Sequence, residues 1–136
     1  MHLSDWRDID ASLLIDAWAE QRARWQTTLF WNADENWAQV EAERQSGRLP
    51  GLALLDGSTL VGWCFFLVHQ DTLQIGGFES TSSTVTRRLL DAVLAAVDPT
   101  LVPSGAMLFA YSDAPGLVPA LVARGFETEP VHLSGA

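Results

Sequence analysis

The chain has 136 residues, of which 48% are hydrophobic and 18% are charged, so it is long enough for one domain and too apolar to be disordered. Eight basic and seventeen acidic residues give a net charge of −9, which repels polyphosphate backbones and argues against a nucleic-acid binder. The single cysteine excludes an internal disulfide and a cysteine-ligated zinc, and the longest apolar run, 63–68, is far too short to span a membrane. We therefore expect one domain over residues 1–136 of a cytoplasmic protein with no membrane partner.

Two amphipathic helices are predicted in the first third of the chain. The first is indicated by an apolar stripe at spacings of three, four and seven between residues 9 and 25. Its members are Leu13, Leu14, Ala17, Trp18, Gln21 and Trp25. Asp10 or Ser12 is suited to cap this helix. The second helix is predicted over residues 35–46, where positions 37, 40, 41 and 44 follow the helical period, with Asp34 as a possible N-cap and Gly47 as its stop.

An antiparallel meander of three strands is predicted next, over residues 52–55, 60–69 and 72–79. An Asp-Gly turn joins the first two strands, because Gly57 takes a positive φ at little cost, and a Gln-Asp turn joins the next two. Paired Gly76 and Gly77 are unusual inside a strand. They predict a bulge or a close backbone approach in the third strand of the meander.

The second half of the chain alternates helices and strands. A helix over 84–97 is predicted by apolar positions at helical spacing, with N-caps available in the serine and threonine run 80–84 and a stop at Asp98-Pro99. A strand over 106–111, a helix over 115–123 and a final edge strand over 127–133 follow. The order α-α-β-β-β-α-β-α-β predicts the α/β (α+β) class, with a mixed, mostly antiparallel sheet flanked by helices.

This order of elements resembles the GNAT superfamily of acyl-CoA-dependent N-acyltransferases. Residues 10–46 resemble the family's two N-terminal helices, 51–79 its meander, and 84–97 the helix whose N-terminus receives the CoA pyrophosphate. The segment 116–126, which ends Ala-Arg-Gly-Phe, is similar to the last helix of the family and its Gly-Phe ending. The resemblance implies transfer of an acetyl or short acyl group from acetyl-CoA or another acyl-CoA to an amine.

The predicted pyrophosphate site departs from the family pattern. The motif R/Q-x-x-G-x-G/A falls on residues 81–86, where both glycines and the leading Arg or Gln are absent. Backbone N–H groups at a helix start, serine and threonine hydroxyls and two adjacent arginines remain as phosphate donors. The resemblance implies that CoA is bound by Phe78, Thr81, Ser82, Ser83, Thr84, Val85, Thr86, Arg87 and Arg88. The alternative is a serine-rich helix cap with two solvated arginines.

The resemblance also implies three catalytic candidates. Glu79, at the end of the strand that lines the reaction centre in this family, is the candidate base that accepts the amine proton, with His69 as the alternative. The family's tyrosine, which protonates the departing thiolate, is replaced by Leu121. Tyr111, the only tyrosine of the chain, is the substitute candidate. The alternative for all three is an ordinary solvated side chain at a strand end.

Five of the six tryptophans lie in the first 37 residues, which is more than two short helices require for their core. Phe30, Trp31 and Trp37 are the candidate wall of an acceptor pocket or of a subunit contact. Core packing is the alternative, above all for Trp18 and Trp25 on the apolar stripe. No histidine cluster or calcium-loop pattern is present, so we expect no metal site.

Two classes of function follow from these observations. The first is an N-acyltransferase acting on a small amine. The acidic residues around the first two helices favour an acceptor that is a cation. The second is a catalytically degenerate GNAT-like module for protein association or small-ligand binding, which the missing glycines favour. Because residues 127–133 provide one final strand where the family commonly has two, we expect a homodimer or association with a second GNAT-like chain.

Overall fold

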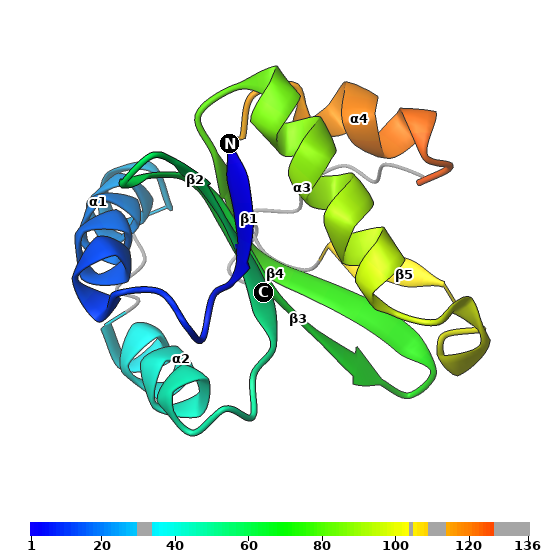
Figure 1. Ribbon diagram of the computed structural model, residues 1–136, viewed down its shortest axis with the longest axis horizontal. Helices are drawn as coiled ribbons and strands as arrows, with labels where there is room; N and C mark the ends of the chain where they lie inside the picture. Colours follow the sequence, from blue (N-terminus) through cyan, green and yellow to red (C-terminus); the bar gives the residue numbers. More distant parts are fainter. Residues whose placement is uncertain (30–33, 104, 109–113, 127–136) are drawn as a thin grey trace.

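A computed structural model describes residues 1–29, 34–103, 105–108 and 114–126 (Figure 1). Over these residues the chain forms one five-stranded sheet in the order β1-β2-β3-β4-β5. The strands are β1 (His2–Asp5), β2 (Gly51–Asp56), β3 (Thr59–His69), β4 (Thr72–Ser80) and β5 (Ala106–Leu108). The first three pairings are antiparallel, and β4 with β5 is parallel. The predicted mixed, mostly antiparallel sheet is therefore confirmed, while the predicted strand over 127–133 lies outside the described residues.

Helices cover both faces of the sheet (Figure 1). On one face lie α1 (Ala11–Leu29) and α2 (Asp34–Gln45), and on the other lie α3 (Ser83–Ala96) and α4 (Leu117–Ala123), with a short 3-10 helix η1 (Pro99–Leu101) after α3. All four predicted helices are present. Each differs from its prediction by a few residues at the ends.

The strand β1 was not predicted, so the element order begins with a strand rather than a helix. Its four residues contain only one large apolar side chain, so the local pattern is closer to that of a loop. The strand exists because it pairs with β2, with His2 opposite Leu55 and Asp5 opposite Leu52. Such a pairing depends on residues some fifty positions away, which local pattern does not report.

The predicted turns and caps are formed by the expected residues. Gly57 takes φ +63° between β2 and β3, and Gln70 and Asp71 both take positive φ between β3 and β4. Ser82 caps α3 by accepting a hydrogen bond from the Val85 backbone N–H at 3.2 Å. The two turns and the cap of α3 are therefore at the predicted residues, whereas Asp34, predicted as a cap, is the first residue of α2 itself.

The sheet separates two apolar clusters, and the side chains of β3 alternate between them. Trp63 and Phe65 face α1 and α2, whereas Cys64 and Phe66 face α3 and α4. Gly62 lets α3 approach closely, because a Cβ atom there would lie 2.6 Å from Val85 Cγ1. The cluster on the α3 side combines aliphatic side chains with Phe66 and Phe78, whereas three tryptophans lie in the cluster on the α1 side.

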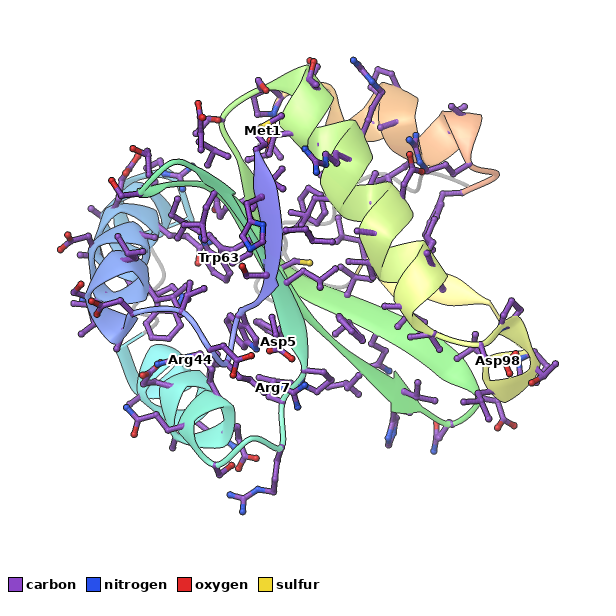
Figure 2. All side chains as sticks on the ribbon, in the orientation of Figure 1. Met1, Asp5, Arg7, Arg44, Trp63 and Asp98 are labelled. Atoms are coloured by element: carbon purple, nitrogen blue, oxygen red, sulfur yellow. The ribbon has the colours of Figure 1, made fainter. Side chains whose placement is uncertain are left out.

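Trp6, which follows β1, is the centre of the cluster on the α1 side. It is fully buried, stacks on Trp63 with centroids 6.0 Å apart and meets Trp18 edge to face at 6.3 Å. Its indole Nε1 donates to the Leu49 carbonyl at 2.8 Å. Core packing therefore accounts for Trp6 and Trp18, and Figure 2 shows Trp63 on the same side of the sheet. The side chain of Trp25 lies outside the described residues.

Candidate functional site

A β-bulge in β4 determines which side chains face α1. Trp63 lies opposite Glu79 and Phe65 lies opposite Gly76, so β4 carries one residue more than β3 between these pairs. The predicted bulge is confirmed. In an unbroken ladder, Phe78 would lie opposite Trp63 on the α1 side and Glu79 would face the aliphatic cluster under α3. The extra residue reverses the two, so Phe78 is buried in the α3 cluster and Glu79 faces α1.

The bulge requires glycine at position 77. Gly77 has φ +61°, in the left-handed region that other residues rarely adopt. A Cβ atom at this position would also lie 2.7 Å from the Trp63 ring and 2.8 Å from the Phe65 ring. Both the backbone conformation and the packing of the aromatic rings therefore depend on the missing side chain.

Glu79 meets two side chains of α1. Gln21 Nε2 donates a hydrogen bond to Glu79 Oε1, and Arg24 Nη2 lies 3.0 Å from Glu79 Oε2. Residues 21 and 24 are three apart, which places them on one face of the helix. We call Gln21, Arg24 and Glu79 the α1–β4 cluster. It joins α1 to β4 through residues 58 positions apart in the sequence.

Burial within the α1–β4 cluster increases from Arg24 to Gln21. The Arg24 side chain is 35% exposed and that of Glu79 is 13% exposed, whereas Gln21 is fully buried. The Arg24 guanidinium balances the charge of the partly buried carboxylate. Gln21 Oε1 is buried and has no hydrogen-bond partner among the described residues. Gln21 follows the apolar stripe of α1, and the sequence alone does not indicate this contact because Glu79 is 58 positions away.

The start of α3 differs from a glycine cradle. Ser82 Oγ is already used as the cap, and Ser80 Oγ donates to the Ser82 carbonyl at 2.7 Å. Among the residues predicted to bind CoA, the side chains of Phe78, Val85 and Thr86 are buried, so only their backbone groups can meet a ligand. The exposed members are Thr81, Ser83, Thr84, Arg87 and Arg88. Exposed hydroxyls and guanidinium groups thus surround the first turn of the helix.

The structure does not bring His69 together with Glu79. His69 is exposed opposite Thr72 at the β3–β4 turn, and Glu79 lies opposite Trp63. His69 lies six positions along β3 from Trp63, which is roughly 20 Å at about 3.3 Å per residue. Phe30, Trp31 and Tyr111 lie outside the described residues, as does the side chain of Trp37.

Leu121, which was predicted to replace a tyrosine, lies on α4 and is buried in the apolar cluster that α4 shares with α3. Its side chain is therefore part of the core. Within the described part of the chain, no group of three or more histidine, cysteine, aspartate or glutamate side chains is arranged to hold a metal ion. None of the described helices is both long and apolar enough to cross a membrane.

Comparison with known proteins supports the fold. No protein-family model and no curated protein matches the sequence. The chain is similar to the crystal structure of a probable acetyltransferase, with a TM-score of 0.63 and 11% identity over 96% of this chain and 92% of that chain. It is also similar to a mutant of the protein TTHA1254 from Thermus thermophilus, with a TM-score of 0.51 and 24% identity over 63% of this chain and 68% of that chain. The mixed α/β fold is thus similar to that of a probable acetyltransferase.

Proposed function

We propose that the chain is an N-acyltransferase of the GNAT type, which transfers an acetyl or short acyl group from acyl-CoA to the amine of a small acceptor. The observation that carries this proposal is the bulge in β4, which directs the Glu79 carboxylate toward α1. The likeness over nearly the whole chain to a probable acetyltransferase supports it.

Glu79 is the proposed base of this reaction. The amine nitrogen attacks the thioester carbonyl carbon, a C–N bond forms and the C–S bond breaks. Glu79 accepts the proton that the nitrogen loses, and this proton is finally returned to the departing thiolate. Gln21 and Arg24 hold the carboxylate in place through the contacts of the α1–β4 cluster. The bulge interrupts the ladder at residues 76–78 and leaves backbone groups there for the thioester carbonyl and the pantetheine chain.

The start of α3 is the proposed binding site for the CoA pyrophosphate. The first N–H groups of an α-helix have no partner inside the helix and favour an anion. Ser83 and Thr84 add hydroxyl donors, and Arg87 and Arg88 supply the positive charge that an otherwise acidic chain lacks. These residue types fit a pyrophosphate. Side-chain hydroxyls would donate to the phosphate oxygens here, where glycines would let the backbone N–H groups come close.

Isothermal titration with acetyl-CoA and with CoA tests this proposal. We expect micromolar binding that weakens at least tenfold, or about 1.4 kcal/mol, in the double variant Arg87→Ala with Arg88→Ala. Arg7→Ala with Arg48→Ala is the matched control, because these exposed arginines near the end of α2 change the net charge equally. Absence of binding to either ligand overturns the acyltransferase proposal and favours a module for protein association or small-ligand binding.

Association with a second copy, or with a second GNAT-like chain, stays a prediction. The described sheet ends at β1 and β5, and an edge strand is available for pairing. Light scattering behind size exclusion at micromolar concentration tests it. A mass of 14.9 kDa contradicts the prediction, and twice that mass supports it.

A further inference from the structure

The outer edge of β1 carries backbone groups that face away from the sheet. The Trp6 N–H donates to the Gly51 carbonyl at 3.1 Å, which makes these two residues a hydrogen-bonded pair at the end of the β1–β2 ladder. Such pairs alternate along an antiparallel ladder, so positions 2 and 4 also bond to β2, whereas the N–H and C=O groups of Leu3 and Asp5 are directed outward. Among the described residues, β1 is the last strand on this side of the sheet.

Two apolar side chains are exposed along the same edge. Met1 is 51% exposed and Leu3 is 37% exposed. They are two positions apart, so both project from one face of the strand. Outward backbone groups beside exposed apolar side chains form an edge to which a further strand can be added.

This edge carries almost no net charge, although the chain as a whole carries −9. Asp5 is the only carboxylate of β1, which contains no arginine or lysine. Arg7 neutralises it, since the Arg7 backbone N–H donates to Oδ1 at 2.8 Å and Nη2 lies 2.6 Å from Oδ2. Edge strands are commonly protected from association by unpaired charges, and β1 lacks this protection. Two copies of the acidic chain can therefore approach each other here without strong repulsion.

We propose that β1 pairs antiparallel with β1 of a second copy, about a two-fold axis at Leu3. In each copy the Leu3 N–H then donates to the Leu3 carbonyl of the other copy, and the Asp5 N–H donates to the Met1 carbonyl of the other copy. The Asp5 carbonyl is not needed as an acceptor, because it already accepts from the Asp8 N–H at 3.1 Å. The outward groups of the edge are thus satisfied, and the two sheets join into one.

Charge and side-chain matching select the axis at Leu3. With this axis the Cα atoms of the two Asp5 residues lie about 14 Å apart, which is beyond the screening length of ~8 Å. An axis at Ser4 would bring them to about 8 Å. The axis at Leu3 also places the two Leu3 side chains directly opposite each other on one face, and His2 opposite Ser4 on the other face.

Sedimentation velocity over a range of micromolar concentrations tests the pairing. Only residues 1–5 of each copy pair, fewer than the roughly 20 residues a side of a standard interface, so we expect a Kd in the micromolar rather than the nanomolar range. Leu3→Pro removes the outward N–H and keeps the bonds to β2, so it should weaken association at least about tenfold with little change in urea unfolding. Leu3→Val keeps the N–H and is the matched control, which should associate as the parent does.

Crosslinking through an introduced cysteine tests the axis. In a hydrogen-bonded pair at the axis the two Cα atoms lie about 5.5 Å apart, within the range of a disulfide. We therefore expect Leu3→Cys to form a covalent dimer on mild oxidation. His2→Cys is the control, because its Cα atoms would lie about 8 Å apart, too far for a disulfide. The native Cys64 is buried and does not interfere.

The outcomes separate this inference from the other proposals. A monomer at every concentration overturns both the pairing and the predicted association. Undiminished association of Leu3→Pro, or equal crosslinking of His2→Cys and Leu3→Cys, overturns the inference alone, because a second copy would then bind elsewhere or in another register. If Leu3→Pro does not fold, crosslinking of Leu3→Cys decides the question. None of these measurements uses a CoA compound, so the acyltransferase proposal stands or fails independently.

Discussion

Two groups of one glutamate, one arginine and one glutamine lie on the side of the sheet that carries α1 and α2. One is the α1–β4 cluster of Gln21, Arg24 and Glu79. The other consists of Glu41, Arg44 and Gln45, which we call the α2 cluster. The same three residue types make the same contacts in both, since the arginine pairs with the glutamate and the glutamine amide donates to it.

The two clusters differ in which member is buried. In the α2 cluster the buried residue is Arg44, only 4% exposed, and its three nitrogens donate to Glu41 and to the Trp6 carbonyl. Figure 2 shows Arg44 between α2 and the segment that follows β1. In the α1–β4 cluster the buried residue is the neutral Gln21, whose oxygen has no partner among the described residues. Every guanidinium nitrogen of the buried Arg44 therefore has a hydrogen-bond partner, whereas the buried amide of Gln21 uses its nitrogen and leaves its oxygen unused.

The largest expected effect comes from the glycine that supports the α1–β4 cluster. We expect Gly77→Ala to lower the free energy of unfolding by about 3 kcal/mol, because its Cβ meets the Trp63 and Phe65 rings and its φ is +61°. Gly47→Ala, at the end of α2, is the matched control. Its φ is +79° but nothing lies within 4 Å, so the expected loss is about 1 kcal/mol. Urea unfolding measures both, and equal losses would show that packing at the bulge is unimportant.

The second-largest expected effect is the difference in coupling energy between the ion pairs of the two clusters. Double-mutant cycles with Arg44→Met and Glu41→Gln, and with Arg24→Met and Glu79→Gln, give the two coupling energies. We expect about 1 to 2 kcal/mol for the α2 pair, because the guanidinium is buried and both of its contacts to Glu41 are 2.8 Å or shorter. For the α1–β4 pair we expect less than about 1 kcal/mol, since Arg24 is one-third exposed. A larger value for the second pair would contradict this order.

A smaller effect is the acid sensitivity of the α2 cluster. Hydrogen bonds from Arg44 hold the pKa of Glu41 below its ordinary value of 4.5, against the opposing effect of partial burial. The unfolded chain therefore binds this proton at higher pH than the folded chain does. The stabilisation by the Glu41–Arg44 pair is complete at pH values above 4.5, and it is lost as the pH falls through the lower pKa of the folded state. We expect Glu41→Gln to flatten this part of the curve of unfolding free energy against pH, and a parallel curve would contradict the assignment.

The smallest effect is expected on the opposite face of the sheet, at Cys64. Burial raises the pKa of this thiol to about 12, so almost no thiolate is present at about pH 8. We expect no reaction with a thiol-specific disulfide reagent until the core opens. The reaction should then be faster in Gly77→Ala than in Gly47→Ala, in the order of their losses of stability. Immediate reaction of the parent protein would show that this face is open to solvent.

Much of the fold was predictable because its signals are local. The Asp-Gly turn, the Ser82 cap and the stop at Gly47 each depend on residues within a few positions. The contacts of Glu41 with Arg44 and Gln45 are also local, at three and four residues along one helix, but they were not predicted. The sequence also located the bulge near Gly76 and Gly77 and singled out Glu79.

The α1–β4 cluster was not predictable in the same way. Gly76 and Gly77 indicate a bulge near these positions, but they do not show how β4 pairs with β3 on either side of it, and this pairing decides whether Glu79 or Phe78 faces α1. Gln21 follows the apolar period of α1, so its pattern is that of a core residue. The sequence does not predict the contact between Gln21 and Glu79, because 58 positions separate them.

The order of residues thus specified the class of fold, the helices and the meander, because periodicity, capping and turn chemistry act over short distances. Pairing in space added β1, turned Glu79 to the α1 side and placed Gln21 against it. The physical reason is that a strand alternates its side chains with a period of two. One inserted residue therefore exchanges the two faces, and the pairing with the partner strand decides which residues lie on each side of the insertion.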